Sequence, residues 1–166
     1  MSKKALADAL LTFQFPLQNR DNVLENGQKY YRGFVLGRVT SWAHEGGTRG
    51  KEKIDSRLTK LKKYQDIHKL ARQCLIKHDP TFKFTSIQFN KNHKMKRHKD
   101  GKNVGESYII GFGDYTGGEL MVYNKEGTKY KLVNIKNKFF KFDGSVYPHE
   151  TAPFKGNRFT LVYYTN

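Results

Sequence analysis

The sequence has almost no cysteine: Cys74 is the one thiol among 166 residues. No disulfide can therefore form within the chain, which indicates a reducing compartment. No apolar run approaches the ~20 residues that a membrane-spanning helix needs. The N-terminal stretch has no small-residue cleavage pattern, so we expect no secretory signal. We expect a soluble protein without a membrane partner, in the nucleus or cytoplasm of a cell, with a virus or phage as a possible source.

Acidic residues are also scarce. There are 15 aspartates and glutamates against 31 lysines and arginines, so the formal net charge is +16. Such an excess favours a polyanionic partner, with nucleic acid ahead of a membrane surface. A basic protein with no nucleic-acid role is the alternative. The sequence does not address the oligomeric state.

Helical periodicity is confined to one part of the chain. Residues 30–41 are rich in β-formers and broken by two glycines, which predicts a strand pair or a strand with a bulge. Residues 44–53 predict a polar, glycine-rich loop. From Ile54 to Leu75 apolar residues recur at helical spacing, and the helix is expected to end at residues 78–80, before a proline. His68 and His78 on this helix are interpreted as surface or packing residues.

Strand-like alternation dominates after Pro80. The expected strands cover residues 82–90, 106–112, 118–124, 128–134, 138–142 and 158–165. The fold class is therefore α+β, mainly β, with a double-stranded β-helix (jelly-roll) core and a supporting N-terminal helical segment. We expect a single domain over 1–166, in which 1–80 supports a core at 81–166. A β-sandwich used only for binding would give the same pattern.

One acidic residue interrupts the most basic run of the chain. His98 and Asp100 are two apart, so in an extended segment their side chains point to the same side. His149 is a third candidate ligand. Two histidines and one carboxylate form the facial triad that suits Fe(II), with positions left for a bidentate co-substrate and O₂. His93 is a rival ligand, and zinc is an alternative that the lack of clustered cysteines disfavours.

The last predicted strand opens with a basic residue, Arg158, and Thr160 lies two positions on. A buried arginine binds a carboxylate with high geometric specificity. The order of these features is informative: an H-x-D motif, a distant histidine and then an arginine at the start of the final strand. This order favours a site that holds a metal together with a dicarboxylate.

Two stretches carry a family resemblance: FTSIQFNKNHKMKRHKDGKNVGESYIIGFGDYTGGELMVY and FFKFDGSVYPHETAPFKGNRFTLVYYT. They resemble the Fe(II)/2-oxoglutarate-dependent dioxygenases, and most of all the TET/JBP branch, which oxidises 5-methyl groups of pyrimidines in nucleic acid. The resemblance is strong over residues 82–165 and looser over 31–79. It implies that His98, Asp100 and His149 bind iron, and that Arg158 and Thr160 bind the distal carboxylate of 2-oxoglutarate.

The resemblance also implies further contacts. Asn103 matches a position that contacts the target base, and Gln88 and Asn90 are co-substrate candidates by looser likeness to AlkB-like relatives. Five basic residues flank the site and are candidates for holding phosphates: Lys94, Lys96, Arg97, Lys99 and Lys102. Arg49, Lys51 and Lys53 in the glycine-rich loop could add to them. No cysteine-rich zinc-binding extension or separate DNA-binding domain is evident.

The predicted activity is oxidation of 5-methylcytosine or thymine in nucleic acid, DNA ahead of RNA, with Fe(II), 2-oxoglutarate and O₂. A base in duplex DNA must first be flipped into the pocket. Two alternatives stay open. One is a hydroxylase of prolyl or lysyl side chains that uses the same iron chemistry. The other is a jelly-roll binding module without activity.

Overall fold

The computed structural model describes residues 2–45 and 48–166, together with their side chains except those of residues 2, 21 and 40–53. It contains two α-helices, α1 (Ser2–Thr12) and α2 (Lys62–His78), and two short 3-10 helices, η1 (Asp21–Val23) and η2 (Arg57–Lys60). The strands are β1 (Leu17–Gln18), β2 (Tyr31–Glu45), β3 (Thr48–Asp55), β4 (Ser86–Lys91), β5 (Ser107–Phe112), β6 (Tyr115–Gly117), β7 (Leu120–Tyr123), β8 (Tyr130–Val133), β9 (Phe140–Phe142), β10 (His149–Thr151), β11 (Phe154–Gly156) and β12 (Phe159–Tyr164).

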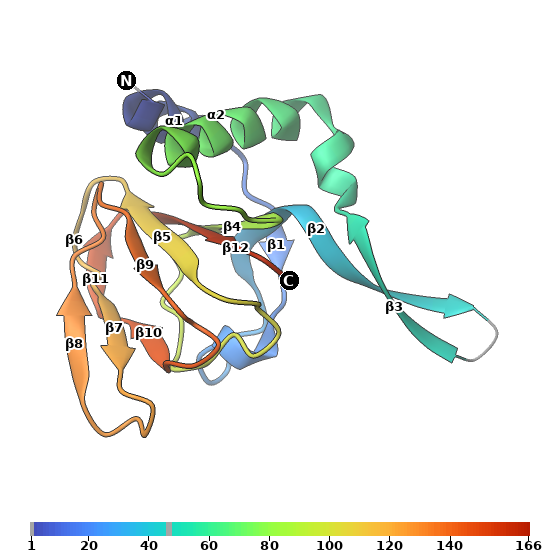
Figure 1. The fold of residues 1–166 in the computed structure, drawn as a ribbon. Helices are drawn as coiled ribbons and strands as arrows, with labels where there is room; N and C mark the ends of the chain where they lie inside the picture. Colours follow the sequence, from blue (N-terminus) through green and yellow to red (C-terminus); the bar gives the residue numbers. More distant parts are fainter. Residues whose placement is uncertain (1, 46–47) are drawn as a thin grey trace.

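The strands form a larger and a smaller antiparallel sheet (Figure 1). The larger sheet has the order β1-β2-β4-β12-β5-β9, with β3 paired to β2, and the smaller has the order β10-β7-β8. Strands β6 and β11 form a separate pair. A cluster of buried side chains from β5, β7 and β9, which includes Ile109, Val122 and Phe142, packs between the two sheets. The prediction of a mainly β jelly-roll core is confirmed.

Period-2 alternation gives the larger sheet two different faces. On β12 the side chains of Phe159, Leu161 and Tyr163 are at most 2% exposed and belong to the main hydrophobic cluster. The residues between them, Thr160 and Val162, line a cavity on the opposite face. β4 repeats the pattern, with Ile87 and Phe89 in the core and Gln88 and Asn90 in the cavity. Each strand thus contributes both to stability and to a polar site.

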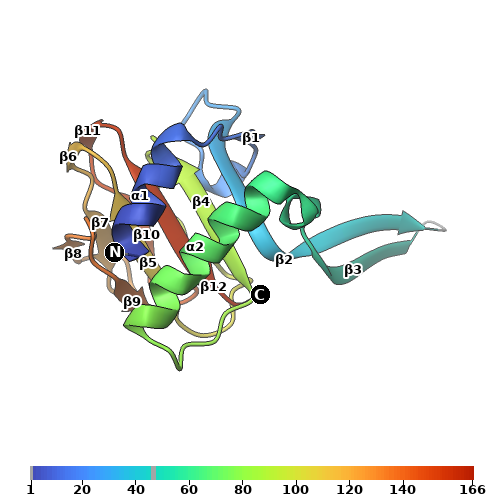
Figure 2. The same ribbon diagram turned by 90° about the horizontal axis from the view of Figure 1, so that it is seen from above.

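The two helices cover the core face of the larger sheet (Figure 2). α2 buries Tyr64, Ile67, Ala71, Cys74 and Leu75, which recur every three or four residues along one stripe. Tyr163 of β12 is fully buried, and its hydroxyl donates a hydrogen bond of 2.7 Å to the Ala71 carbonyl. The single cysteine is therefore a core residue, packed between helix and sheet.

The N-terminal third differs from the sequence prediction in two places. The predicted loop at 44–53 is wrong, because its described residues belong to β2 and β3, which form a hairpin that projects from the body (Figure 1). The predicted helix also begins too early: Ile54 is in β3 and Leu58 is in η2, whereas α2 starts at Lys62. The prediction began too early because Ile54 and Leu58 happen to continue the three- and four-residue spacing of the buried side chains of α2. The side chains of Arg49, Lys51 and Lys53 lie outside those that the structure describes.

Helix α1 was not expected from the sequence. Its buried residues Leu6 and Leu10 are one turn apart and join the same cluster as Leu75 and Tyr163. One hydrophobic cluster therefore combines residues from both sides of Pro80.

β2 remains a single strand, but it changes partner near Gly37, whose φ of +94° suits glycine: residues before it pair with β4 and residues after it with β3. Neither α1 nor α2, the two α-helices in the described ranges, is long and apolar enough to cross a membrane.

Candidate functional site

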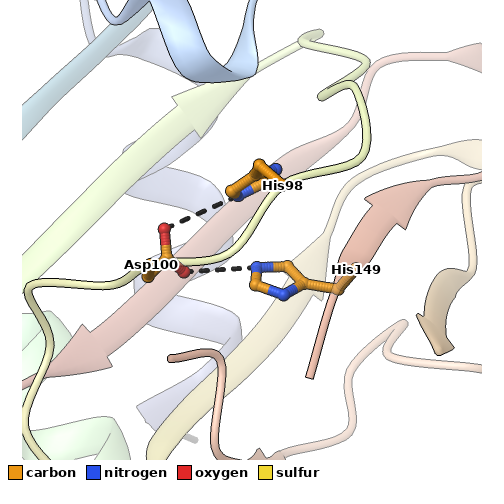
Figure 3. A group of neighbouring side chains, drawn as sticks. All are labelled: His98, Asp100 and His149. Carbon is orange, nitrogen blue, oxygen red and sulfur yellow. Dashed lines mark ion pairs between the residues drawn. The ribbon is translucent and has the colours of Figure 1, made fainter. Parts of the chain in front are cut away.

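Backbone pairing brings the two candidate histidine ligands together. His98 and His149 exchange both N–H···O hydrogen bonds, each 3.0 Å long, as a two-residue antiparallel bridge. The backbone N–H of Asp100 donates to the Gly144 carbonyl at 2.8 Å, which fixes the segment two residues further on. Main-chain hydrogen bonds thus bring together two histidines that are fifty-one residues apart in the sequence. The side chains of the H-x-D motif face His149 (Figure 3).

The imidazole rings are oriented by carbonyl groups behind them. Nδ1 of His98 lies 2.6 Å from the Lys96 carbonyl, and Nδ1 of His149 lies 2.9 Å from the Tyr147 carbonyl. A carbonyl accepts only, so Nδ1 carries a proton, and in the neutral ring Nε2 is left with its lone pair. Both Nε2 atoms face the Asp100 carboxylate, at 3.6 Å for His98 and 3.2 Å for His149 (Figure 3). This is the orientation that metal-binding histidines use.

The candidate ligand atoms of His98, Asp100 and His149 all lie within 4.8 Å of one another. Of the described residues, these three make up the one group of three or more metal-ligating side chains this close together. Two imidazole Nε2 atoms and one carboxylate fit Fe(II) as a facial triad. These three donors are therefore chemically suited to Fe(II), the metal that the family resemblance implies.

The carboxylate at the centre of this group is balanced by positive charge. Burial alone would raise the pKa of Asp100, but the imidazoles of His149 and His98, when they are protonated, and the guanidinium of Arg20 hold it well below its usual range. Nη2 of Arg20 lies 3.1 Å from Oδ1 of Asp100. Burial, followed by the proximity of His149, lowers the pKa of His98 to about 4. His98 is therefore neutral at physiological pH and competent as a ligand.

His93, the rival ligand, lies outside this group. It is 2% exposed, and its ring stacks on Tyr31 with centroids 4.1 Å apart. Burial lowers its pKa to about 4, and neither ring nitrogen has a hydrogen-bond partner in the described part of the chain. His93 is a packing residue in this structure.

Arg158 is a buried cation at the same cavity, 3% exposed. Its Nε and Nη2 atoms donate to the Gly118 carbonyl at 3.1 and 2.9 Å, and its guanidinium lies over the rings of Tyr115 and Phe154. Burial lowers its pKa, an effect that the nearby Tyr115 phenol opposes, but a guanidinium stays charged. No carboxylate among the described side chains forms an ion pair with it, and the charge of Glu119 acts on it only from a longer distance. A buried cation without a directly paired counter-ion is costly, so this position suits an anionic ligand.

Three further polar residues from the sequence prediction form one hydrogen-bonded row along the cavity. Nδ2 of Asn90 donates to Oγ1 of Thr160 at 3.1 Å, and Nε2 of Gln88 donates to Oδ1 of Asn90 at 3.1 Å. Gln18 continues the row, because its Oε1 accepts from Gln88 at 2.7 Å. The row comes from β1, β4 and β12, which are neighbours or near neighbours in the larger sheet.

The cavity that these groups share has a volume of about 220 Å³. Its apolar wall includes Ile109, Leu120, Phe142 and Val162. Of the predicted substrate residues, Asn103 and Lys102 line the cavity, whereas Lys96, Arg97 and Lys99 are not among the described residues that do. Arg97 and Lys99 are exposed beside it.

Sequence reasoning missed Arg20 and Gly144. Arg20 lies eighty positions before Asp100, in the segment between β1 and η1, where no local pattern marks it. Gly144 approaches the ligands so closely that an added Cβ would lie 3.1 Å from both Oδ2 of Asp100 and Cε1 of His149. The motif DGS at 143–145 held a signal for this turn, since Asp143 Oδ1 accepts from the Ser145 N–H at 3.0 Å.

Comparison with known proteins supports the fold. No protein-family model and no curated protein sequence matches the chain. Among solved structures, the chain is similar to a 2OG-Fe(II) oxygenase family oxidoreductase from Burkholderia pseudomallei, with 17% identity and a TM-score of 0.57 over 98% of this chain and 76% of that one. It is also similar to NgTET1, solved in complex with 5mC DNA, with 16% identity and a TM-score of 0.53 over 81% of this chain and 60% of that one.

These likenesses define the class at the level of the fold. The chain has the fold of the 2OG-Fe(II) oxygenases, with a His-Asp-His cluster that can hold a metal ion. It spans about three fifths of the length of the NgTET1 chain.

Proposed function

We propose that this chain is an Fe(II)- and 2-oxoglutarate-dependent dioxygenase that oxidises the 5-methyl group of a pyrimidine in nucleic acid, with DNA as the favoured polymer. The observation that carries the chemistry is the pairing of two features in one cavity. One is a cluster of three metal-ligating side chains, and the other is a buried arginine that pairs with no carboxylate of the described residues.

His98, Asp100 and His149 would hold the iron. The carbonyls of Lys96 and Tyr147 fix the two rings, so that the Nε2 lone pairs are already directed at one point. Bound iron and 2-oxoglutarate would supply O₂ activation coupled to loss of CO₂ from the co-substrate. The chain's own part is to place the groups and to exclude water.

Arg158 would bind the distal carboxylate of 2-oxoglutarate. Its Nε and Nη2 atoms both donate to the Gly118 carbonyl, which fixes the plane of the guanidinium at the wall of the cavity. Thr160 is adjacent on the same face of β12 and has a hydroxyl hydrogen of its own to donate, because Asn90 donates to its oxygen. The cavity is smaller than the roughly 300–1,000 Å³ of drug-sized pockets, which suits a compact dicarboxylate.

The polymer is inferred from charge and from the rim of the cavity. The net charge of +16 favours a polyanion, and Lys102 and Asn103 follow the iron-binding motif directly at the cavity. The N–H of Asn103 donates to the Asp100 carbonyl at 3.0 Å, so a tight turn places this amide beside the metal cluster. A flipped base would meet this turn before it reached the iron.

Mass spectrometry of nucleosides is the decisive test. The chain is incubated with Fe(II), 2-oxoglutarate and ascorbate, and with DNA or RNA that contains 5-methylcytosine or thymine. We expect hydroxymethylated nucleosides and a matching amount of succinate. An Asp100→Ala variant is the matched control for adventitious iron chemistry.

The experiment tests the nucleic-acid substrate and the dioxygenase chemistry separately. Succinate without any oxidised nucleoside would contradict the nucleic-acid substrate and would point to a side-chain hydroxylase, which peptide substrates would then test. The absence of succinate under all these conditions would contradict the dioxygenase assignment and leave a binding module.

A further inference from the structure

A second concavity lies at the open side of the jelly roll, between β8 and β9. β8 is the last strand of the smaller sheet and β9 is the last strand of the larger one, so two sheet edges face each other here. The space has a volume of about 780 Å³, more than three times that of the metal-site cavity. We name it the β8–β9 groove. Val122 and Phe142 line it, and Phe142 also lines the metal-site cavity.

Aromatic side chains form much of the groove. Tyr130 on β8 is 56% exposed and Tyr147, before β10, is 36% exposed. The ring of Tyr123 lies 5.4 Å from that of Tyr130, across the β7–β8 pair. Exposed tyrosine faces along a groove are surfaces on which unpaired bases can stack.

The groove is also basic. Four lysines line it, Lys125, Lys129, Lys131 and Lys141, all exposed. None of the four forms an ion pair with a carboxylate of the described residues. The acids of the lining are Glu106 and Asp143, and Oδ1 of Asp143 already accepts from the N–H and hydroxyl of Ser145. Positive charge is therefore in excess and is available to an external anion.

The groove leads to both histidines of the metal cluster. The guanidinium of Arg97 lies over the Tyr123 ring, 3.8 Å from its centroid, and hydrogen-bonds to the Gly127 carbonyl in the β7–β8 turn. The residue after Arg97 is His98. At the other end, Tyr147 lines the groove while its carbonyl lies 2.9 Å from Nδ1 of His149. A ligand in the groove would thus lie next to the segments that hold the metal.

We propose that the β8–β9 groove binds a single-stranded segment of the nucleic-acid substrate beside the oxidised nucleotide. Bases stack on Tyr130 and Tyr147, and phosphates lie against Lys129, Lys131 and Lys141. This inference rests on the proposed function, because it gives that function its polymer-binding surface. Single strands are favoured over duplex because stacking on tyrosine requires an unpaired base face.

Two simpler roles would also place lysines here, and the tyrosines of the groove distinguish nucleic-acid binding from both. Lysines on edge strands also protect against edge-to-edge pairing of sheets, which would make them irrelevant to binding. An acidic peptide would need the lysines but not the ring of Tyr130. The test must therefore change the aromatic and the basic residues separately.

The experiment measures binding of a fluorescein-labelled single-stranded oligonucleotide, and of the matching duplex, by fluorescence polarisation over a range of salt concentrations. The variants are Tyr130→Ala, Tyr130→Phe and the double variant Lys129→Glu/Lys131→Glu. The control is Lys69→Glu/Lys77→Glu, which makes the same change of charge on exposed positions of α2, on the other side of the larger sheet. Consumption of 2-oxoglutarate and formation of succinate in the presence of the oligonucleotide, Fe(II) and ascorbate are measured in parallel.

We expect Tyr130→Ala to weaken single-strand binding at least fivefold and Tyr130→Phe to leave it unchanged. The groove lysine variant should weaken it more than tenfold and reduce the salt slope, whereas the α2 control should change it less than twofold. An equal loss in both lysine variants, or no loss in Tyr130→Ala, overturns the inference. If the groove variants bind the single strand as tightly as wild type while succinate is still formed, the inference about the groove is wrong and the proposed function stands. If single-strand binding follows the groove but no 2-oxoglutarate is consumed, the proposed function fails instead.

Discussion

The two charged ends of the metal-site cavity are built in opposite ways. At one end Asp100 is surrounded by Arg20, His98 and His149, so the buried negative charge is balanced by the protein itself. At the other end Arg158 is also buried, but among the described residues its hydrogen-bond partner is a carbonyl. The first end can keep its shape without a ligand. The second would gain a counter-ion from a bound carboxylate, which fits the role in ligand recognition that we propose for Arg158.

The largest effect is expected from Asp100→Ala. Loss of the carboxylate should reduce succinate formation by more than the roughly 10–100-fold that loss of an outer partner of a metal ligand costs. His93→Ala serves as the comparison and should retain turnover, since His93 is separate from the cluster. If His93→Ala abolishes turnover and Asp100→Ala does not, the ligand set is wrong.

Arg158→Lys tests the other end of the cavity. A lysine keeps the charge but cannot reproduce the planar guanidinium, so the concentration of 2-oxoglutarate needed for half-maximal turnover should rise roughly 30-fold or more. Metal binding should stay near the wild-type value, measured by titration with Mn(II). An unchanged 2-oxoglutarate requirement would remove Arg158 from this role.

Gly118→Ala should act through Arg158. Gly118 has a φ of +67°, and an added Cβ would lie 2.7 Å from Nε of Arg158. We expect roughly a tenfold rise in the 2-oxoglutarate requirement, equivalent to about 1.4 kcal/mol. Gly105→Ala is the matched control, because Gly105 has a φ of +72° and nothing within 4 Å of its added Cβ. Equal effects in the two variants would mean that backbone strain, not displacement of Arg158, is responsible.

Arg20→Gln should destabilise the metal-free protein more than the metal-loaded one. Without metal, the guanidinium of Arg20 pairs with the buried carboxylate of Asp100, whereas a bound cation would supply that positive charge instead. The expected loss is about 1–2 kcal/mol in the free energy of unfolding, measured by denaturant titration. Lys94→Gln removes an exposed pair with Glu25 and should cost less. Equal losses with and without metal would contradict this picture.

The smallest effect concerns pH. The pKa of His93 is about 4 in the folded chain and 6.5 when unperturbed, so the unfolded chain binds a proton first as the pH falls. The contribution of His93 should leave stability unaffected above pH ~6.5 and lower it progressively down to pH ~4. His93→Phe should remove about 1 kcal/mol or more of this loss while keeping the stack on Tyr31. Unfolding at several pH values checks it, and identical pH profiles would contradict it.

The sequence predicted best where the pattern was local. Alternation along β4 and β12 placed both strands to within a few residues, and the spacing of His98 and Asp100 predicted that their side chains share one side. β3 could not be found in this way, because Thr48–Asp55 has few β-formers and is a strand through its pairing with β2. Arg20 was missed for a related reason: its contact with Asp100 spans eighty residues and exists only in the folded chain. The roles of the site residues, and the division of the chain at residue 80, stay predictions.

The alternating faces of β12 have a consequence for how the protein can fail. A one-residue slip of this strand would move Phe159, Leu161 and Tyr163 into the cavity and turn Arg158 and Thr160 towards the helices. Such a chain would bury a cation in the hydrophobic core and fill the proposed co-substrate site with the side chains of Phe159, Leu161 and Tyr163. A copy with this slip would therefore lose both the core packing and the arrangement of the candidate site. Packing of the core and assembly of one wall of the candidate site thus depend on the same register of β12.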